Sequence, residues 1–222
     1  MKKRVIVFSM VILGSCLAVD AESLSESSVR SVENLEIAAR QFSDQKQWGR
    51  AQDLYRKILN LNEKRWGKDD PRLLTSLNNV VRVTCVDGKC ADTVPFLSQM
   101  LKIRLKQFGR NHADTATTYA LIGEANEKMF RFREARVNFV EAVRVRDAVF
   151  GKTDSISISS RLNLIRVALK QKDFSYAEKM IVECQSLQAK QKPLDQALSH
   201  QISFYKKKIV QTSKPVHEKV GL

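Results

Sequence analysis

The 222-residue sequence predicts an all-α fold, a solenoid of antiparallel helix pairs. Composition is the first observation behind this prediction. Hydrophobic residues make up 43% and charged residues 28%, a balance typical of a folded chain, and the 8 glycines and 4 prolines are too few for loop-rich β architectures. The second observation is internal repetition, because the glycines at 67, 109 and 151 are spaced 42 residues apart and each follows an aromatic residue.

Two sets of residues with this period define four repeat units. The first set is the aromatic-glycine pairs, each followed by a polar loop: Trp66-Gly67, Phe108-Gly109 and Phe150-Gly151. The second set places an aromatic residue three positions before an alanine: Trp48 before Ala51, Phe132 before Ala135 and Phe174 before Ala177, with Thr93 at the equivalent place of the second unit. Together they divide the chain into units 31–72, 73–114, 115–156 and 157–198.

Each unit is predicted to form two helices. In the third unit, apolar residues recur at helical spacing in two stretches, first at Tyr119, Ile122, Gly123 and Met129, then at Ala135, Phe139, Ala142, Val143 and Val149. The small alanine after each aromatic residue would let the two helices approach closely. Gly151 is expected in the left-handed conformation after a helix end, and Asp70 is expected to cap a helix that begins at Pro71.

This pattern resembles the tetratricopeptide repeat (TPR), in the 42-residue variety found in kinesin light chains. The matching residues are Leu77-Asn78-Asn79, the loop from Phe108 to Asp114 and the aromatic-x-x-Ala turns. The resemblance covers residues 31–198 and implies a right-handed α-solenoid of about four units with a C-terminal capping helix. It also implies a surface for protein–protein interaction, without naming the partner.

The first 21 residues are predicted to be a signal peptide. A basic head, Lys2-Lys3-Arg4, precedes an apolar run from Val5 to Val19, which is shorter than the roughly 20 residues of a membrane-spanning helix. Cleavage before Glu22 would make the protein periplasmic or secreted. Lipidation of Cys16, in the sequence Leu-Gly-Ser-Cys, would instead make it a membrane lipoprotein, and an uncleaved anchor is the third alternative.

The segments that flank the repeats have simpler interpretations. Residues 22–30 are rich in serine and are expected to form a linker. A helix from about Leu194 to Gln211 is expected to shield the last open face of the solenoid. Residues 199–222 would then comprise the continuation of this capping helix and a tail.

Cysteine placement predicts a disulfide in the second unit. Cys85 and Cys90 bracket the turn between its two helices, and Cys90 occupies the position that is aromatic in the other units. We expect these cysteines to form a disulfide, for which export would supply the oxidising environment, and the alternative is two free thiols. Pro95 requires the following helix to begin near Asp92, and Cys184 is expected to be a small buried residue.

The expected ligand-binding residues lie on the first helix of each unit. In the second unit Asn78, Asn79 and Arg82 share one helix face, and Asn163 and Arg166 repeat part of this cluster two units later. Arg40 and Glu124 occupy the position of Arg82 in the first and third units. The resemblance implies that these residues contact a bound peptide on the concave face, and the alternative is that they are ordinary solvated residues.

The formal charge of +14 suggests a second kind of partner. The second helices carry many cations: Lys102, Arg104, Lys106, Arg131, Arg133, Arg136, Arg144 and Arg146. They could form a solvated outer face or attract an anionic surface in the cell envelope. A nucleic acid partner is not expected, because no recognition motif is present and export would separate the protein from most nucleic acid. The oligomeric state is left open.

No constellation of residues suggests catalysis. The three histidines are His112, His200 and His217, and His112 lies in an inter-unit loop where capping is the expected role. No nucleophile elbow, zinc-protease motif or nucleotide-binding loop occurs, so we expect neither an enzyme nor a metal or cofactor. The sequence thus predicts an exported scaffold that binds a peptide segment, with an envelope-surface binder as the alternative.

Overall fold

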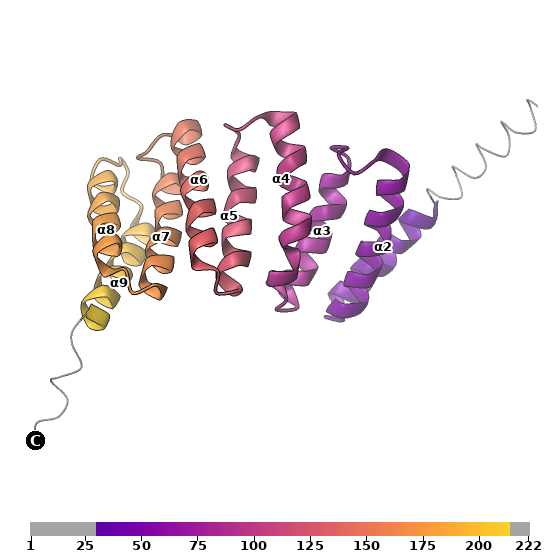
Figure 1. The fold of residues 1–222 in the computed structure, drawn as a ribbon, viewed down its shortest axis with the longest axis horizontal. Coiled ribbons are helices and arrows are strands. Elements are labelled where there is room, and N and C mark those ends of the chain that lie inside the picture. Colours follow the sequence, from indigo (N-terminus) through magenta and orange to yellow (C-terminus); the bar gives the residue numbers. More distant parts are fainter. Residues whose placement is uncertain (1–29, 214–222) are drawn as a thin grey trace, which may run out of the picture.

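The computed structural model describes residues 30–213, and these form helices and no strand (Figure 1). The first helix occupies residues 30–44 of the described range. It is followed by α2 (Trp48–Trp66), α3 (Leu73–Val86), the short 3-10 helix η1 (Cys90–Thr93), α4 (Val94–Phe108), α5 (Ala113–Lys128), α6 (Phe132–Phe150), α7 (Ser155–Lys170), α8 (Phe174–Gln188) and α9 (Gln196–Ser213). The predicted signal peptide, with Cys16, most of the linker and the tail from residue 214 lie outside the described residues.

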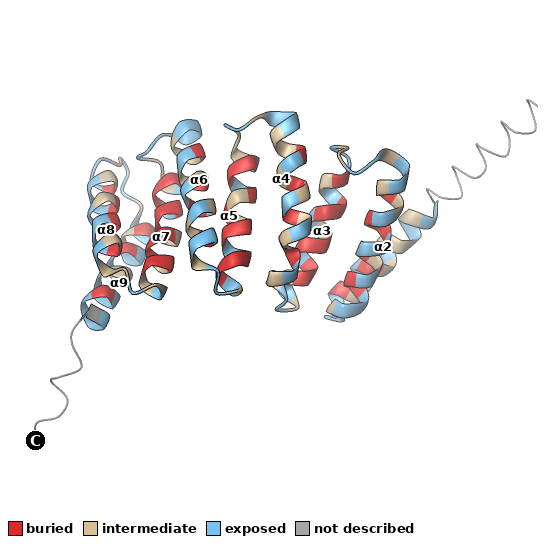
Figure 2. Ribbon diagram, in the orientation of Figure 1, coloured by how far each residue is buried: buried red, intermediate tan, exposed pale blue. Residues whose placement is uncertain are grey.

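The helices stack as successive antiparallel pairs in a single row (Figure 1). Each helix from α2 to α8 packs on its neighbours in sequence, and α9 packs on both α7 and α8. This arrangement confirms the predicted all-α solenoid with its capping helix, which begins at Gln196 rather than at Leu194. Buried residues line the sides of the helices that face one another along the row (Figure 2).

The turns within the four pairs share one backbone conformation. A residue with positive φ occupies the same place in each turn, at Lys46 (57°), Gly88 (81°), Phe130 (59°) and Lys172 (58°). The next residue donates its N–H to the carbonyl five positions earlier, as Arg131 does to Asn126 at 2.9 Å. These are Schellman turns, in which glycine is the usual residue, yet three of the four positions carry a side chain.

The loops between pairs use glycine for a different reason. Gly67, Gly109 and Gly151 have φ of 84°, 77° and 87° with ψ of 158°, −176° and 153°. The prediction of a left-handed Gly151 is therefore right in the sign of φ and wrong in ψ, because the chain leaves the helix in an extended direction. This region of backbone space is essentially restricted to glycine.

Side chains at one repeated position cap the first helices. His112 Nδ1 accepts a hydrogen bond from the N–H of Asp114, and Asp154 accepts one from the N–H of Ile156 at 2.8 Å. Asp70 accepts from the N–H of Arg72 in the same way, but α3 begins only at Leu73, because Pro71 and Arg72 form a turn. The bond to Asp70 therefore lies in the turn before α3, whose N-cap is Arg72 without a side-chain cap, so the expected Asp70 cap and the expected helix start at Pro71 are both wrong.

The core depends on small residues at the predicted positions. Ala51, Thr93, Ala135 and Ala177 are all fully buried. Gly123 in α5 is also buried, and the Phe139 ring of α6 occupies the space where a side chain at position 123 would lie. The absence of a side chain at position 123 thus lets the Phe139 ring of α6 pack directly against the α5 backbone.

A polar contact with the same period joins neighbouring pairs. The second helix of one unit donates a hydrogen bond to a hydroxyl on the first helix of the next unit. These bonds are Asn62 to Ser76 at 2.9 Å, Arg104 to Thr118 at 2.6 Å and Arg146 to Ser160 at 2.6 Å. Each pair therefore satisfies buried polar groups of its neighbour, which fixes the relative rotation of adjacent units.

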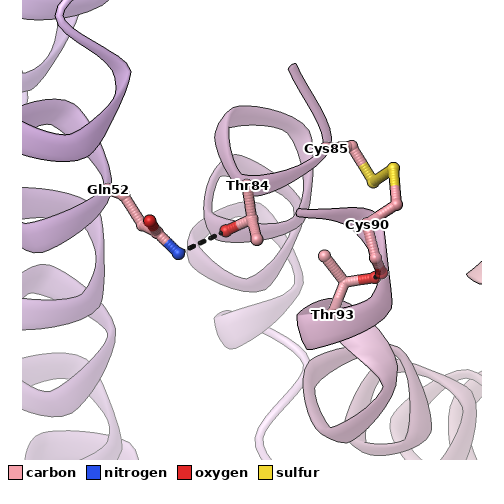
Figure 3. Close-up of a disulfide and its surroundings, with 5 residues drawn as sticks. All are labelled: Gln52, Thr84, Cys85, Cys90 and Thr93. Atoms are coloured by element: carbon pink, nitrogen blue, oxygen red, sulfur yellow. Dashed lines mark hydrogen bonds between the residues drawn. A yellow bond between two sulfur atoms is a disulfide. The ribbon is translucent and has the colours of Figure 1, made fainter. Parts of the chain in front are cut away.

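The turn of the second unit is closed by the cysteines (Figure 3). The sulfur atoms of Cys85 and Cys90 lie at disulfide distance, which supports the predicted pairing. Residues 90–93 form η1, so α4 begins at Val94 rather than near Asp92, with Pro95 in its first turn as expected. Cys184 is fully buried, and burial raises the pKa of its thiol to about 12, so it is an inert core residue.

Candidate functional site

The predicted residues of the second unit are free to meet a ligand. Asn78 and Arg82 are exposed on α3, and Asn79 is half-buried beside them. Within residues 30–213 none of these three side chains has a hydrogen-bond or ion-pair partner. Their donors and acceptors are therefore available, which is the chemistry that an extended peptide backbone or a carboxylate requires.

The equivalent residues of the first and third units contribute less. Arg40 is exposed and lies 3.7 Å from Glu36 one helical turn earlier, a weak surface ion pair. Glu124 is exposed on α5, and its negative charge replaces the cation found at this place in the other units. The predicted face thus carries one acidic residue among three basic ones at this position.

The predicted residues of the fourth unit line a groove. Asn163 and Arg166 on α7 face the capping helix α9 across a groove of about 470 Å³. The α7 wall is mainly polar and also contains Ser159 and Leu162, whereas the α9 wall is largely aromatic and contains His200, Gln201, Phe204 and Tyr205. The sequence alone could not identify the α9 wall, because the docking of that helix is not part of the repeat.

Arg166 is already bound within the protein. Its guanidinium donates to both carboxylate oxygens of Glu127, with N–O distances of 3.0, 3.0 and 2.8 Å, and Lys170 contacts the same carboxylate at 2.8 Å. Burial pushes the pKa of Glu127 upward, but the hydrogen bonds from Arg166 and Lys170 outweigh it, so the pKa lies below its ordinary value. Arg166 can therefore offer a ligand only the part of its guanidinium that Glu127 leaves free.

A second groove of about 410 Å³ opens beside the first, at the end of α7. Four cations surround it: Arg166, Lys170, Lys172 and Lys208. Its apolar lining is formed by Leu169, Phe174 and Tyr205. Lys172 and Lys208 have no acidic partner among the described residues, so this groove favours an anionic ligand. Sequence reasoning missed it, because its walls come from a turn and from the capping helix.

Comparison with known proteins identifies the repeats. The family model described as tetratricopeptide repeat matches residues 72–148, which extend from the start of α3 into α6. Residues 72–148 are tetratricopeptide repeats. A search of curated protein sequences found no significant match to the chain.

Solved structures extend the TPR fold to most of the chain. A Podosopora anserina protein described as a kinesin light chain with nearly identical TPR-like repeats is 17% identical, with a TM-score of 0.67 over 82% of this chain and 88% of that one. A single-substitution variant of it is 18% identical, with a TM-score of 0.64 over 80% and 84%. BtubC (BKLC) from P. vanneervenii is 18% identical, with a TM-score of 0.60 over 71% and 63%. These similarities confirm the predicted kinesin-light-chain-like TPR fold, which is typical of protein–protein interaction scaffolds.

The outer helices of the TPR array hold fewer free cations than the sequence suggests. Five of the eight predicted residues are bound within the protein: Lys102 to Asp69, Arg104 to Thr118, Arg136 to Asp173, Arg144 to Glu141 and Arg146 to Ser160. Arg136 also stacks on Tyr176, with its Cζ atom 3.7 Å from the centroid of the tyrosine ring. Lys106, Arg131 and Arg133 have no such partner among the described residues, so three of these eight predicted cations remain free to meet an anionic surface.

No described part of the TPR array is arranged for metal-dependent chemistry or for spanning a bilayer. Across residues 30–213, no three histidine, cysteine or acidic side chains lie together in a way that could hold a metal ion. In the same range no helix has the length and apolar character to cross a membrane. His112 caps α5, as expected, and stacks on Phe108 with ring centroids 4.4 Å apart.

Proposed function

We propose that this TPR array is an exported, non-enzymatic scaffold that binds an extended segment of a partner protein in the cell envelope. The segment would lie along the face formed by the first helices, which is the concave face in arrays of this kind. The groove between α7 and α9 carries the proposal, because two residues chosen from the repeat pattern, Asn163 and Arg166, line it. Phe204, 60% exposed at the same groove, supplies an apolar contact.

The chemistry of the face suits a peptide backbone. The amide of Asn163 can donate to a carbonyl and accept from an N–H of an extended chain, and so can the free amides of Asn78 and Asn79. Export is part of the proposal and is supported by the basic and apolar N-terminal pattern and by the Cys85–Cys90 pair.

Site-specific crosslinking in the native cell tests the proposal. A photoreactive amino acid placed at position 163 or 78 should crosslink to a segment of one partner protein, identified by mass spectrometry. The matched control is position 60, an exposed asparagine on α2 that lines a groove on the second-helix side. Crosslinks at position 60 alone, or equal crosslinks at all three positions, would exclude this face as the binding site.

A substitution then tests the groove itself. Asn163→Ala should weaken binding of the crosslinked partner segment by about tenfold, because the segment would lose two hydrogen bonds to a half-buried amide. Asn60→Ala should leave the affinity unchanged. Arg166 is unsuitable for this test, because its removal would also leave the buried Glu127 with a single cation.

A further inference from the structure

One edge of the array carries an aromatic side chain that the fold does not require. Phe130, in the turn between α5 and α6, is 79% exposed, and its φ of 59° lies in the left-handed region. The equivalent positions are Lys46, Gly88 and Lys172, so this turn forms equally well with lysine or glycine. A phenylalanine here costs both backbone energy and apolar exposure, so an external role is the better explanation.

The cations around Phe130 are unpaired. Lys128, Arg131 and Arg133 lie in the same turn or flank it, all are exposed, and none has an acidic partner among the described residues. The corresponding turns of the first two units are neutral. Asp44 offsets Lys46 in the first, and Lys89 is bound to Asp87 at 2.6 Å in the second. The excess positive charge is therefore confined to the C-terminal half of this edge.

The cationic groove at the end of α7 adjoins Phe130. The Phe130 ring lies 6.1 Å from the Phe132 ring, edge to face, and Lys170 Nζ of the groove lies 6.0 Å from the Phe132 ring. Figure 1 places the α5–α6 turn, the α7–α8 turn and the end of α9 along the same edge of the array. We call this surface the turn edge and define it by Lys128, Phe130, Arg131, Arg133, Lys172 and Lys208.

We propose that the turn edge docks the TPR array onto a membrane surface rich in anionic phospholipid. Phe130 would insert among the head groups while the surrounding lysines and arginines face the lipid phosphates. A membrane fits better than a peptide, because Phe130 protrudes from a turn with 79% of its surface exposed, and a fluid interface accepts a protruding ring without a shaped pocket. The turn edge includes Arg131 and Arg133, two of the free cations predicted for the outer helices, and the proposal does not depend on peptide binding.

Vesicle sedimentation at low ionic strength tests this docking. The chain beginning at Glu22 is used, because it retains every described residue and omits the apolar run that would bind vesicles by itself. It should bind vesicles of equal parts phosphatidylglycerol and phosphatidylcholine and should not bind phosphatidylcholine alone. Lys172→Gln should weaken partitioning about fivefold, and Lys152→Gln, in a loop at the opposite edge, should not.

Glycine at position 130 gives the sharpest comparison. Phe130→Gly should weaken partitioning about tenfold, and since glycine suits the left-handed conformation the melting temperature should not fall. Lys46→Gly introduces glycine at the equivalent position of the turn in the first unit and should leave partitioning unchanged. Absence of binding to anionic vesicles would overturn the proposal, as would equal binding by Phe130→Gly or an equal loss with Lys46→Gly. Loss of a crosslinked protein partner on Phe130→Gly, without any vesicle binding, would assign the turn edge to a protein instead.

Discussion

We expect Gly123→Ala to destabilise the TPR array, although the same change inside a helix ordinarily stabilises a protein. A Cβ atom at position 123 would lie 2.7 Å from Phe139 Cε1 and 2.8 Å from Cδ1. Phe139 is fully buried, so its ring cannot move into solvent. Alanine gains about 1 kcal/mol of helix propensity, whereas overpacking a buried ring costs about 2–3 kcal/mol. The net loss should be about 1–2 kcal/mol.

Urea unfolding followed by circular dichroism measures this loss. The matched control is Gly49→Ala in α2, where a Cβ atom meets nothing within 4 Å, and this variant should gain up to about 1 kcal/mol. Phe139→Leu, which replaces the opposing ring with a smaller aliphatic side chain, should make Gly123→Ala much less harmful, with a coupling energy of about 1–2 kcal/mol in the double-mutant cycle. A stabilised Gly123→Ala protein, or fully additive changes, would refute the close packing of α5 on α6.

Three further predictions concern individual contacts. Glu127→Gln should cost about 2 kcal/mol at neutral pH, less than for a fully buried pair because Arg166 remains partly exposed. The pKa of Glu127 in the folded protein lies below its ordinary value of 4.5, so its ionised carboxylate stabilises the fold above pH 4.5, and this stabilisation is lost as the pH falls through the folded pKa. The pH–stability curve of the variant should lack this loss. Cys85→Ser should cost about 2 kcal/mol in oxidising buffer, from the short loop that the bond to Cys90 closes, and a difference that persists after reduction of both proteins would contradict this origin. Asp154→Ala should cost about 1 kcal/mol in thermal unfolding and Asp154→Ser much less, because serine also caps a helix, so equal losses would exclude the capping role.

The repeat period predicted the fold because it marks positions where the backbone or the packing tolerates few residues. The glycines at 67, 109 and 151 adopt a conformation closed to other residues, so their spacing reports the inter-unit loops directly. The turns inside the pairs gave no such signal. Lysine and phenylalanine at 46, 130 and 172 do not mark a left-handed turn, and only Gly88 would have suggested one.

Partners of the candidate site residues were harder to predict than their positions. Arg166 and Glu124 occupy the same place in adjacent units, and Glu127 lies one helical turn after Glu124. Opposite charges offset by one turn on neighbouring first helices were therefore visible in the sequence once the units were aligned. Whether Arg166 pairs with Glu124 or with Glu127 depends on the rotation of α7 relative to α5. That rotation is set by side-chain packing rather than by the repeat pattern.

The distribution of bound and free polar groups gives the two ends of the array different properties. In the C-terminal half, Arg161 is 4% exposed and binds both Asp147 and Glu183, which ties α6, α7 and α8 together. Removal of one member of such a buried cluster is costly, so these helices keep a fixed geometry and can hold a shaped groove. In the second unit, by contrast, Asn78 and Arg82 have no partner among residues 30–213, so their side chains can adjust to a bound peptide. A peptide that crossed both regions would therefore gain its specificity from the preformed groove at α7 and α9, and additional affinity from the adaptable side chains of α3.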